Sequence, residues 1–496
     1  MKTAVTRDLA QIRVQIEEFL KNAREPTLLE PGEELLPLSG ENYSLEMRGS
    51  RLTLQAWDRT RNWSRRLTAI TESGNARLAM TVEHFARREG QMFLLDLGRR
   101  SGAELSKRTG RLVFRERFRL FLRRQFPEWT LAEVSAEADL EHSLSPAFPR
   151  AYLKHGQHGW AAIACPPDGD ASAVLTFGLI WLAYLRARER RVALEGLAVY
   201  FPAGQERGAA LRVLCLDARS ARFELFTYTP QDDMVRAEPR DYGNLDTRLE
   251  PCRRPAPNIA EPWQEIGDLP GVERISQHDG RTSLRVRGIE FAELRGGDLF
   301  FGLAERRPAR AQHAAEIARL AGELDRARQP GADTAHPLYR QYPEACLESQ
   351  ARAQIETLDA TLCRDPIYGQ VPAFVAGQRG VLDLLAVDRT GRLTVVELKA
   401  SADPHLPLQA LDYWVRVKWH LDRGEFSANG YFPGIELRAD PPRLLLVSPS
   451  LEYHPTTETI LGFFAPGIEV ERVGLAVEWR RGLHVMFRLN GAQRPQ

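Results

Sequence analysis

Two apolar segments of strand length, residues 380–388 and 393–398, lie close together toward the end of the chain. The polar segment 389–392 separates them and has a glycine near its end, which is typical of a β-hairpin connection. Both segments are apolar at successive positions, so both faces of the two strands are expected to be covered. A charged residue inside this hairpin is therefore expected to be buried, which is costly unless the charge has a partner.

Three charged side chains of the hairpin are expected to meet at one point. If Asp388 faces Arg392, the register places Asp383 directly opposite Glu397, with Cβ atoms about 5 Å apart. Lys399 lies two positions beyond Glu397 and therefore points to the same face. Two carboxylates at this spacing could hold one metal ion, whereas the simpler alternative is a structural salt bridge inside a covered sheet.

Lysine is rare in this chain, which makes Lys399 informative. Only six of the 67 basic residues, Lys and Arg together, are lysine. A chain with this bias would be expected to use arginine in an ordinary ion pair, whereas a compact point charge beside an attacking water favours an ammonium group. The composition thus favours a functional role for Lys399.

The segment from about residue 340 to 450 resembles the PD-(D/E)xK nuclease superfamily, whose core is a helix, a three-stranded meander, a helix and a strand. Asp383 matches the Asp of the motif, Glu397-Leu398-Lys399 matches its ExK, and Leu382 stands where proline is usual. The resemblance implies a metal-dependent nuclease. It also implies a mixed α/β (α+β) chain whose C-terminal part is a restriction-endonuclease-like αβββαβ core preceded by a small β module.

Flanking segments supply the other elements of such a core. Residues 344–363 carry apolar side chains at helical spacing, 370–374 would form the first strand, and 443–447 would form a buried parallel strand. In the expected first helix, Glu348 is the candidate for the acid that the superfamily places there. Glu344, one turn earlier, is the rival.

A second helix is expected to open at Pro407, because proline suits the first helical turn. Gln409, Tyr413 and Arg416 share one face of this helix. The Gln-x-x-x-Tyr spacing is similar to the fourth motif of one branch of the superfamily, which contacts nucleic acid near the metal. These three side chains are therefore the expected nucleic-acid-binding residues.

The resemblance implies Mg²⁺ or Mn²⁺ as cofactor, in line with the oxygen ligands that these hard cations prefer. The expected metal ligands are Asp383, Glu397, Glu348 and the backbone carbonyl of Leu398. The ion would activate a water molecule and stabilise charge on the phosphate, and Lys399 would orient that water. The expected catalytic residues are thus Asp383, Glu397, Lys399 and Glu348.

An earlier part of the chain has the same order of expected elements: helix 111–126, strands 129–134, 149–153 and 160–164, helix 174–185 and strand 196–201. Matching the third strands places Ala164 at the position of Glu397 and Pro166 at that of Lys399. No carboxylate occurs between residues 142 and 167. We therefore expect a degenerate, inactive copy of the nuclease-like core in the N-terminal half; the alternative is an unrelated α/β domain.

A short sequence match and the proline-rich stretches define the expected domains. Residues 44–49 resemble residues 283–288, which indicates a duplicated β module. In the later copy, arginines 281, 285, 287 and 295 would form either a basic surface or the polar face of an ordinary sheet. The expected parts are an N-terminal helix and connector (1–35), a small β module (36–105), the α/β domain with the inactive core (106–250), a proline-rich linker (251–270), a second small β module (271–305), a bridging helix (306–335) and the nuclease domain (336–496).

Charge, cysteines and hydropathy set further limits. The formal net charge is +1, so nucleic-acid binding would depend on local arginine clusters. Five widely spaced cysteines without a CxxC motif indicate neither a disulfide framework nor a thiolate zinc site. The longest apolar stretch, residues 173–185, is too short to span a bilayer. We expect a cytoplasmic protein that binds no membrane and that is either a monomer or a homodimer.

The functional hypothesis from the sequence is an Mg²⁺- or Mn²⁺-dependent endodeoxyribonuclease in repair, restriction or defence, with DNA preferred over RNA. The alternative is a catalytically silent nucleic-acid-binding or scaffold protein on the same fold, in which the charges of the hairpin are structural. The presence of Asp383, Glu397 and Lys399 together favours the nuclease.

Overall fold

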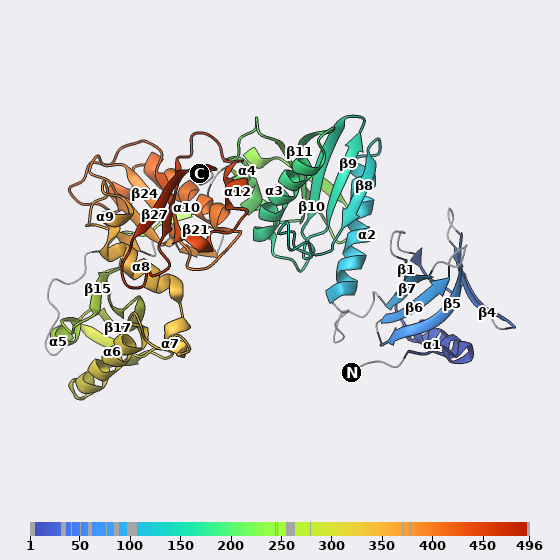
Figure 1. Ribbon diagram of the computed structural model, residues 1–496, viewed down its shortest axis with the longest axis horizontal. Coiled ribbons are helices and arrows are strands. Elements are labelled where there is room, and N and C mark those ends of the chain that lie inside the picture. Colours follow the sequence, from blue (N-terminus) through green and yellow to red (C-terminus); the bar gives the residue numbers. More distant parts are fainter. Residues whose placement is uncertain are drawn as a thin grey trace. The chain divides into compact units, whose positions relative to one another are not determined.

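The computed structural model describes most of the chain, and its elements fall into two compact units (Figure 1). The first unit comprises residues 1–206 and 224–236, and the second comprises residues 207–223 and 237–496. The described residues are 5–30, 36–40, 42–49, 51–57, 62–75, 77–83, 89–96, 107–243, 245, 247–253, 263–277, 279–369, 372–375, 378–381 and 383–493, with the backbone alone at 62–63, 107–109, 372–375 and 378–381.

The first unit begins with a small β module. Helix α1 (Leu9–Asn22) starts at Asp8, whose side chain accepts a hydrogen bond from the backbone N–H of Ala10. Its buried face, which includes Ile12 and Ile16, packs on an antiparallel sheet with the strand order β2-β1-β7-β6-β5-β4-β3. The strands are β1 (Pro26–Leu29), β2 (Leu36–Pro37), β3 (Tyr43–Arg48), β4 (Arg51–Trp57), β5 (Asn62–Ser73), β6 (Arg77–Glu83) and β7 (Glu89–Asp96).

An α/β core, called the first core below, follows the module. Its sheet has the order β13-β12-β11-β10-β9-β8, in which β8, β9 and β10 form an antiparallel meander and β11 lies parallel to β10. Phenylalanines of α2 cover one face of the sheet, and the strongly apolar α3 crosses over to β11. The elements are α2 (Lys107–Gln125), β8 (Thr130–Ser135), β9 (Arg150–His155), β10 (His158–Ala164), α3 (Ala171–Arg188), β11 (Ala193–Pro202), β12 (Arg222–Tyr228) and β13 (Met234–Ala237).

The second unit contains the second small β module, an antiparallel sheet with the order β15-β16-β17-β18-β19. Helix α6 buries Ile317 and Leu324 in the core of this module. The segment expected to be a bridging helix, residues 306–335, is therefore packed on its own sheet. The elements are α5 (Trp263–Gly267), β15 (Val272–Ser276), β16 (Thr282–Val286), β17 (Ile289–Arg295), β18 (Asp298–Phe301), β19 (Arg307–Pro308) and α6 (Ala314–Arg328).

The second core has a sheet with the order β20-β23-β24-β25-β26-β27. Strands β20, β23 and β24 pair antiparallel, and helix α10 then leads to β25, which lies parallel to β24. Helices α8 and α9 cover the face lined by Val396, Leu398 and Leu445. The elements are α7 (Pro337–Arg340), α8 (Pro343–Ala353), α9 (Ile355–Leu358), β20 (Tyr368–Gly369), β23 (Leu384–Val387), β24 (Leu393–Leu398), α10 (Leu406–Asp422), α11 (Glu425–Ala428), β25 (Arg443–Pro449), α12 (Thr457–Leu461), β26 (Val470–Leu475) and β27 (Val485–Asn490).

The first strand of this meander differs from the prediction. Residues 370–374 were expected there, but the two-residue strand β20 pairs with β23 instead. The strands β21 (Pro372–Val375), β22 (Gln378–Val381) and β14 (Thr247–Leu249) form a separate sheet, in which β21 pairs with both neighbours. The hydrogen-bonding edges of β21 are thus occupied outside the main sheet. Residues 370 and 371 lie outside the described part of the chain.

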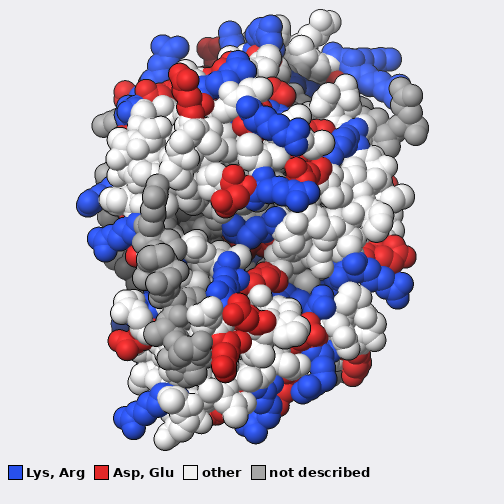
Figure 2. Space-filling view, turned by 90° about the vertical axis from the view of Figure 1, so that its left-hand side faces the viewer, with Lys and Arg blue, Asp and Glu red and all other residues white. Residues whose placement is uncertain are grey.

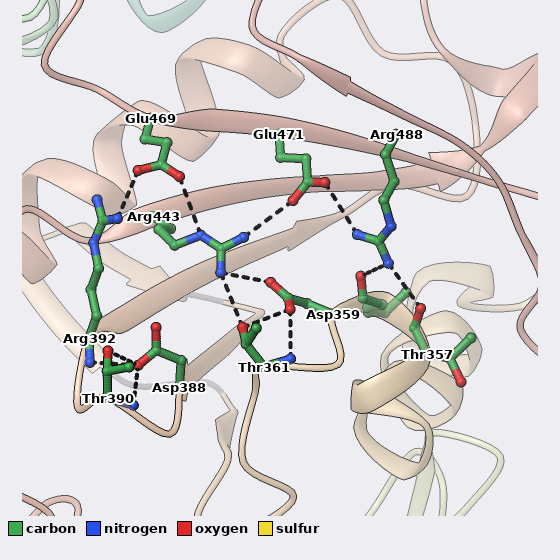
Figure 3. A network of polar contacts seen from close by, with 11 residues as sticks. Thr357, Asp359, Thr361, Asp388, Thr390, Arg392, Arg443, Glu469, Glu471 and Arg488 are labelled. Atoms are coloured by element: carbon green, nitrogen blue, oxygen red, sulfur yellow. Dashed lines mark hydrogen bonds and ion pairs between the residues drawn. The ribbon is translucent and has the colours of Figure 1, made fainter.

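A network of ion pairs ties together the ends of β23 to β27 that lie away from Asp383 (Figure 3). Arg443 stands at its centre and contacts Asp359 Oδ2 at 2.7 Å and Glu471 Oε2 at 3.3 Å. Burial opposes ionisation of Asp359, but hydrogen bonds from Thr361 and the ion pair with Arg443 outweigh it and lower the pKa of this carboxyl. The network fixes one end of the sheet, so that the loops at its other end start from rigid strands.

Candidate active site at the end of β24

The hairpin register agrees with the sequence prediction. Leu384 pairs with Val396 and Val387 pairs with Leu393, while the backbone N–H of Asp388 donates to the carbonyl of Arg392 at 2.9 Å. One further step along the same register sets residue 383 against residue 397. The predicted juxtaposition of the two carboxylates across neighbouring strands is thereby confirmed.

Asp383 lies directly before β23 and is held by the backbone of the neighbouring strand. Its Oδ2 atom accepts a hydrogen bond of 2.8 Å from the backbone N–H of Leu398. Burial raises the pKa of Asp383 to about 7; the bond from Leu398 opposes this, and the negative charge of Glu348 adds to it. In the absence of a cation, this carboxyl is poised between its protonated and ionised forms at neutral pH.

Glu397 lies on β24 and is almost completely buried, at 3% exposure. Its Oε2 atom has no hydrogen-bond partner in the described structure. Burial, followed by the negative charge of Asp383, raises its pKa well above the ordinary value, and Lys399 acts in the opposite direction. A buried carboxylate oxygen without a donor is unusual in a folded protein, and a bound cation would satisfy it.

Lys399 follows the last residue of β24 and joins the same group. Its backbone N–H donates to the carbonyl of Val447 at 3.0 Å, which extends the parallel pairing with β25 by one step. Its Nζ atom lies 3.4 Å from Asp403 Oδ2. Its positive charge partly offsets the rise in pKa that burial causes at Asp383 and Glu397, so the ammonium group interacts with both carboxylates. The sequence had not singled out Asp403, although its spacing of four residues from Lys399 was visible.

Glu348 approaches the pair from α8 and is buried, at 8% exposure. Both Glu348 and Glu344 raise the pKa of Asp383, and the effect of Glu348 is the larger. Of the two candidates for the first-helix acid, Glu348 therefore interacts more strongly with the site. Its Oε1 atom is 3.1 Å from Arg352 Nη2 and 3.5 Å from Arg285 Nη1, so this carboxylate already has two cationic partners.

Helix α10 adds a phenol and a guanidinium beside the carboxylates. Burial and then the charges of Glu397 and Asp383 raise the pKa of Tyr413. The guanidinium of Arg416 lies 5.7 Å from the centre of the Tyr413 ring. Gln409, one turn before Tyr413, is partly buried. Tyr413 and Arg416 are thus brought to the site together.

The third strands of the two cores, β10 and β24, match in a different register from the one predicted. Cys165, not Pro166, takes the place of Lys399, because its backbone N–H donates to the carbonyl of Tyr200 in the parallel strand β11, at 2.8 Å. Ala164 faces the core under α2, as Leu398 faces the core under α8. The expected match of Ala164 with Glu397 was therefore wrong by one residue, and a shift of one residue turns every side chain to the other face.

With this register, the first core has no carboxylate at either critical position. Ile163 takes the place of Glu397 and pairs with Arg150, which takes the place of Asp383. The first core thus lacks the carboxylate pair, as predicted, but the residues at the two positions are Arg150 and Ile163. Burial raises the pKa of Cys165 to about 12, so its thiol is not prepared to act as a nucleophile.

Charges of both signs are mixed over the coloured part of the face that Figure 2 shows. On the coloured part of the face in Figure 2, Lys and Arg side chains alternate with Asp and Glu. The four arginines of the candidate basic surface all have acidic partners: Arg281 contacts Asp279 and Glu293, Arg285 contacts Glu348, Arg287 contacts Asp325, and Arg295 contacts Glu293. These contacts favour the polar face of an ordinary sheet over a free basic surface.

Among the described residues, no group of three or more His, Cys, Asp or Glu side chains is arranged to hold a metal ion. No helix in the described part of the chain has the length and apolar character needed to cross a bilayer. Asp383 and Glu397 supply two carboxylates, which suit a hard divalent cation when water or a backbone carbonyl completes its ligands. Neither the family models nor the curated proteins contain a match to this chain.

Proposed function

We propose that the second core is a metal-dependent nuclease that hydrolyses phosphodiester bonds, with DNA as the preferred substrate. The observation that carries the proposal is the buried Glu397 oxygen without a hydrogen-bond partner, beside Asp383 and within the influence of Lys399. Two buried carboxylates side by side are costly to a fold, and a bound cation would offset that cost. The order of α8, the meander, α10 and β25 supports the proposal through its resemblance to the PD-(D/E)xK core.

In this proposal, Asp383 and Glu397 hold one Mg²⁺ or Mn²⁺ ion, with the Leu398 carbonyl as a further ligand. When bound, the ion supplies an acidified water and stabilises charge on the phosphate. The backbone N–H of Leu398 keeps Asp383 oriented toward β24. Lys399 places its Nζ beside the reacting centre and supports negative charge as it develops. Tyr413, Arg416 and Gln409 position the nucleic-acid strand.

A second candidate is a catalytically silent nucleic-acid-binding or scaffold protein. The first core favours it, because that core has the same order of elements without any carboxylate at the two positions. Lys399 also has a local partner in Asp403, as a structural ion pair would have. The two candidates differ in one measurable property, which is cleavage.

The test is a cleavage screen with the full chain on single-stranded, flapped, mismatched and duplex DNA and on RNA, with Mg²⁺, with Mn²⁺ and with EDTA. We expect metal-dependent cleavage that Asp383→Ala and Glu397→Gln each abolish while binding of the same oligonucleotide persists. The matched control is Asp440→Ala, which removes an exposed carboxylate paired with Arg438 and should leave cleavage unchanged. Binding without cleavage of any substrate would establish the silent protein instead.

A further inference from the structure

Arg285 links the second β module to the proposed active site. It lies on β16, is 6% exposed, and its Nη1 atom reaches the Glu348 carboxylate on α8 at 3.5 Å. Its Nε atom donates to Ser283 Oγ at 3.0 Å, so the side chain is fixed from within the module. The Arg285 guanidinium of the second β module thus contacts Glu348 of α8, whose negative charge raises the pKa of Asp383.

The second β module packs closely against α8, so the contact between Arg285 and Glu348 is part of a packed interface. Gly288, in the turn between β16 and β17, has a φ of +82°, and a Cβ atom there would lie 1.9 Å from the carbonyl oxygen of Ala345. Ser349 of α8 donates a short hydrogen bond to Glu273 of β15. The backbone of the β16–β17 hairpin therefore sits directly on the helix that carries Glu348.

Among the described acids outside the pair, Glu348 has the largest effect on Asp383, and a second metal ion beside the first would need a further carboxylate of this kind. Here its Oε1 atom is already occupied by Arg352 of its own helix and by Arg285. Room for the Arg352 guanidinium comes from Gly369, where a Cβ atom would lie 2.1 Å from Arg352 Nη2. Two guanidinium groups neutralise the carboxylate and repel a divalent cation at the same place.

We propose that Arg285 is a positioning residue through which the second β module keeps the active site at one divalent ion, by holding Glu348 as its own partner. The inference rests on the proposed function, since it concerns the ion held by Asp383 and Glu397. It gives the module a role at the site that does not require contact with nucleic acid.

The test counts Mn²⁺ ions bound to the full chain, by calorimetric titration and by electron paramagnetic resonance, which resolves coupled ion pairs. We expect one ion in the wild type and two in Arg285→Gln, with the second bound at least about 10-fold more tightly than any second ion in the wild type. Arg285→Lys, which keeps the charge, should stay at one. Arg287→Gln is the matched control, because Arg287 pairs with Asp325 inside the module.

A double variant, Arg285→Gln with Glu348→Gln, should return to one ion, because it removes the carboxylate that the second ion needs. If Arg285→Gln does not fold, Arg352→Gln frees the same carboxylate from the other side and carries the same expectation. A wild type that binds one ion while both single variants also bind one would overturn this inference and leave the proposed function intact. A wild type that binds no ion in an Asp383-dependent manner would overturn both.

Discussion

The first and second cores share an order of elements but differ in what stands at the end of the third strand. Each has a helix, an antiparallel meander, a crossover helix and a parallel strand. The second core places Asp383, Glu397 and Lys399 there, and the first places Arg150, Ile163 and Cys165 in the equivalent positions. The shared order of elements therefore does not by itself require these charges.

Arg150 shows how the first core uses the position of Asp383. The side chain is buried; its Nη2 donates to the carbonyl of Glu137 at 2.8 Å, and its Nη1 donates to that of Ser145 at 3.4 Å. Its guanidinium also lies 5.5 Å from the centre of the Trp181 ring. Arg150 thus anchors the segment between β8 and β9, although its Nε atom has no hydrogen-bond partner, whereas the unpartnered atom of the second core is a carboxylate oxygen, Glu397 Oε2. The difference separates a position used for stability from one available for chemistry.

The largest expected effect comes from exchanging Ile163 and Glu397, which stand at equivalent positions of β10 and β24. Ile163→Glu would bury a carboxylate against Gly178, and the guanidinium of Arg150 opposite it is already engaged with the carbonyls of Glu137 and Ser145, so the exchange should lower the free energy of unfolding by about 4 kcal/mol. Glu397→Ile removes such a charge and should stabilise the metal-free protein. Urea unfolding in EDTA measures both. Destabilisation of similar size by both exchanges would show that Glu397 is satisfied in the fold.

Lys399 offers the next largest effect, on catalysis. Lys399→Met removes the ammonium group from the reacting centre and should lower kcat by about 10²- to 10³-fold, equivalent to about 3–4 kcal/mol. The matched change in the first core, Cys165→Ser, should leave kcat unchanged. Single-turnover cleavage at saturating Mg²⁺ measures the effect, and Mn²⁺ binding by Lys399→Met should persist. An unchanged rate would make Lys399 a partner of Asp403 only.

The turn glycines of the two hairpins should respond unequally to alanine. Gly391 has a φ of +87°, and a Cβ atom there would lie 2.1 Å from the carbonyl oxygen of Glu436, so Gly391→Ala should cost about 2–3 kcal/mol. Gly156 has a φ of +60° with open space around it, and Gly156→Ala should cost about 1 kcal/mol. Thermal and urea unfolding compare them. Equal costs would mean that the loop around Glu436 can move away from the hairpin.

The last contrast is a pH dependence of stability that only the second core should show. Because the pKa of Asp383 is raised in the folded protein, its contribution to stability is complete below about pH 4 and is lost as the pH rises through about 7. Asp383→Asn, which stays neutral, should therefore gain about 3 kcal/mol over the wild type between pH 4.5 and 8 in EDTA.

Urea unfolding across that pH range measures the gain, with Asp440→Asn as the exposed control. Mg²⁺ should reverse the order at pH 8, because it stabilises the wild type and has no complete site in the variant. A difference that does not vary with pH would show that the Asp383 carboxyl is ionised at every pH tested.

The sequence by itself determined the local features of the second core. Apolar runs around a short polar turn fixed the β23–β24 hairpin and its register, because the length of the turn sets which residues face each other. It also indicated helix α10 and its face with Tyr413 and Arg416. The separate sheet formed by β14, β21 and β22 was not predicted, since β14 is a three-residue strand that lies far from β21 and β22 along the chain.

Only the tertiary structure decided which charges at the site are free. Glu348 was visible as a helix acid, and Arg352 lies four residues from it, but nothing in the sequence connects Glu348 to Arg285, 63 residues earlier. The correct partners of Ile163 and Arg150 likewise depended on the observed pairing of β9, β10 and β11. Local patterns follow from neighbours along the chain, whereas the charge at a buried site depends on groups that only packing brings together.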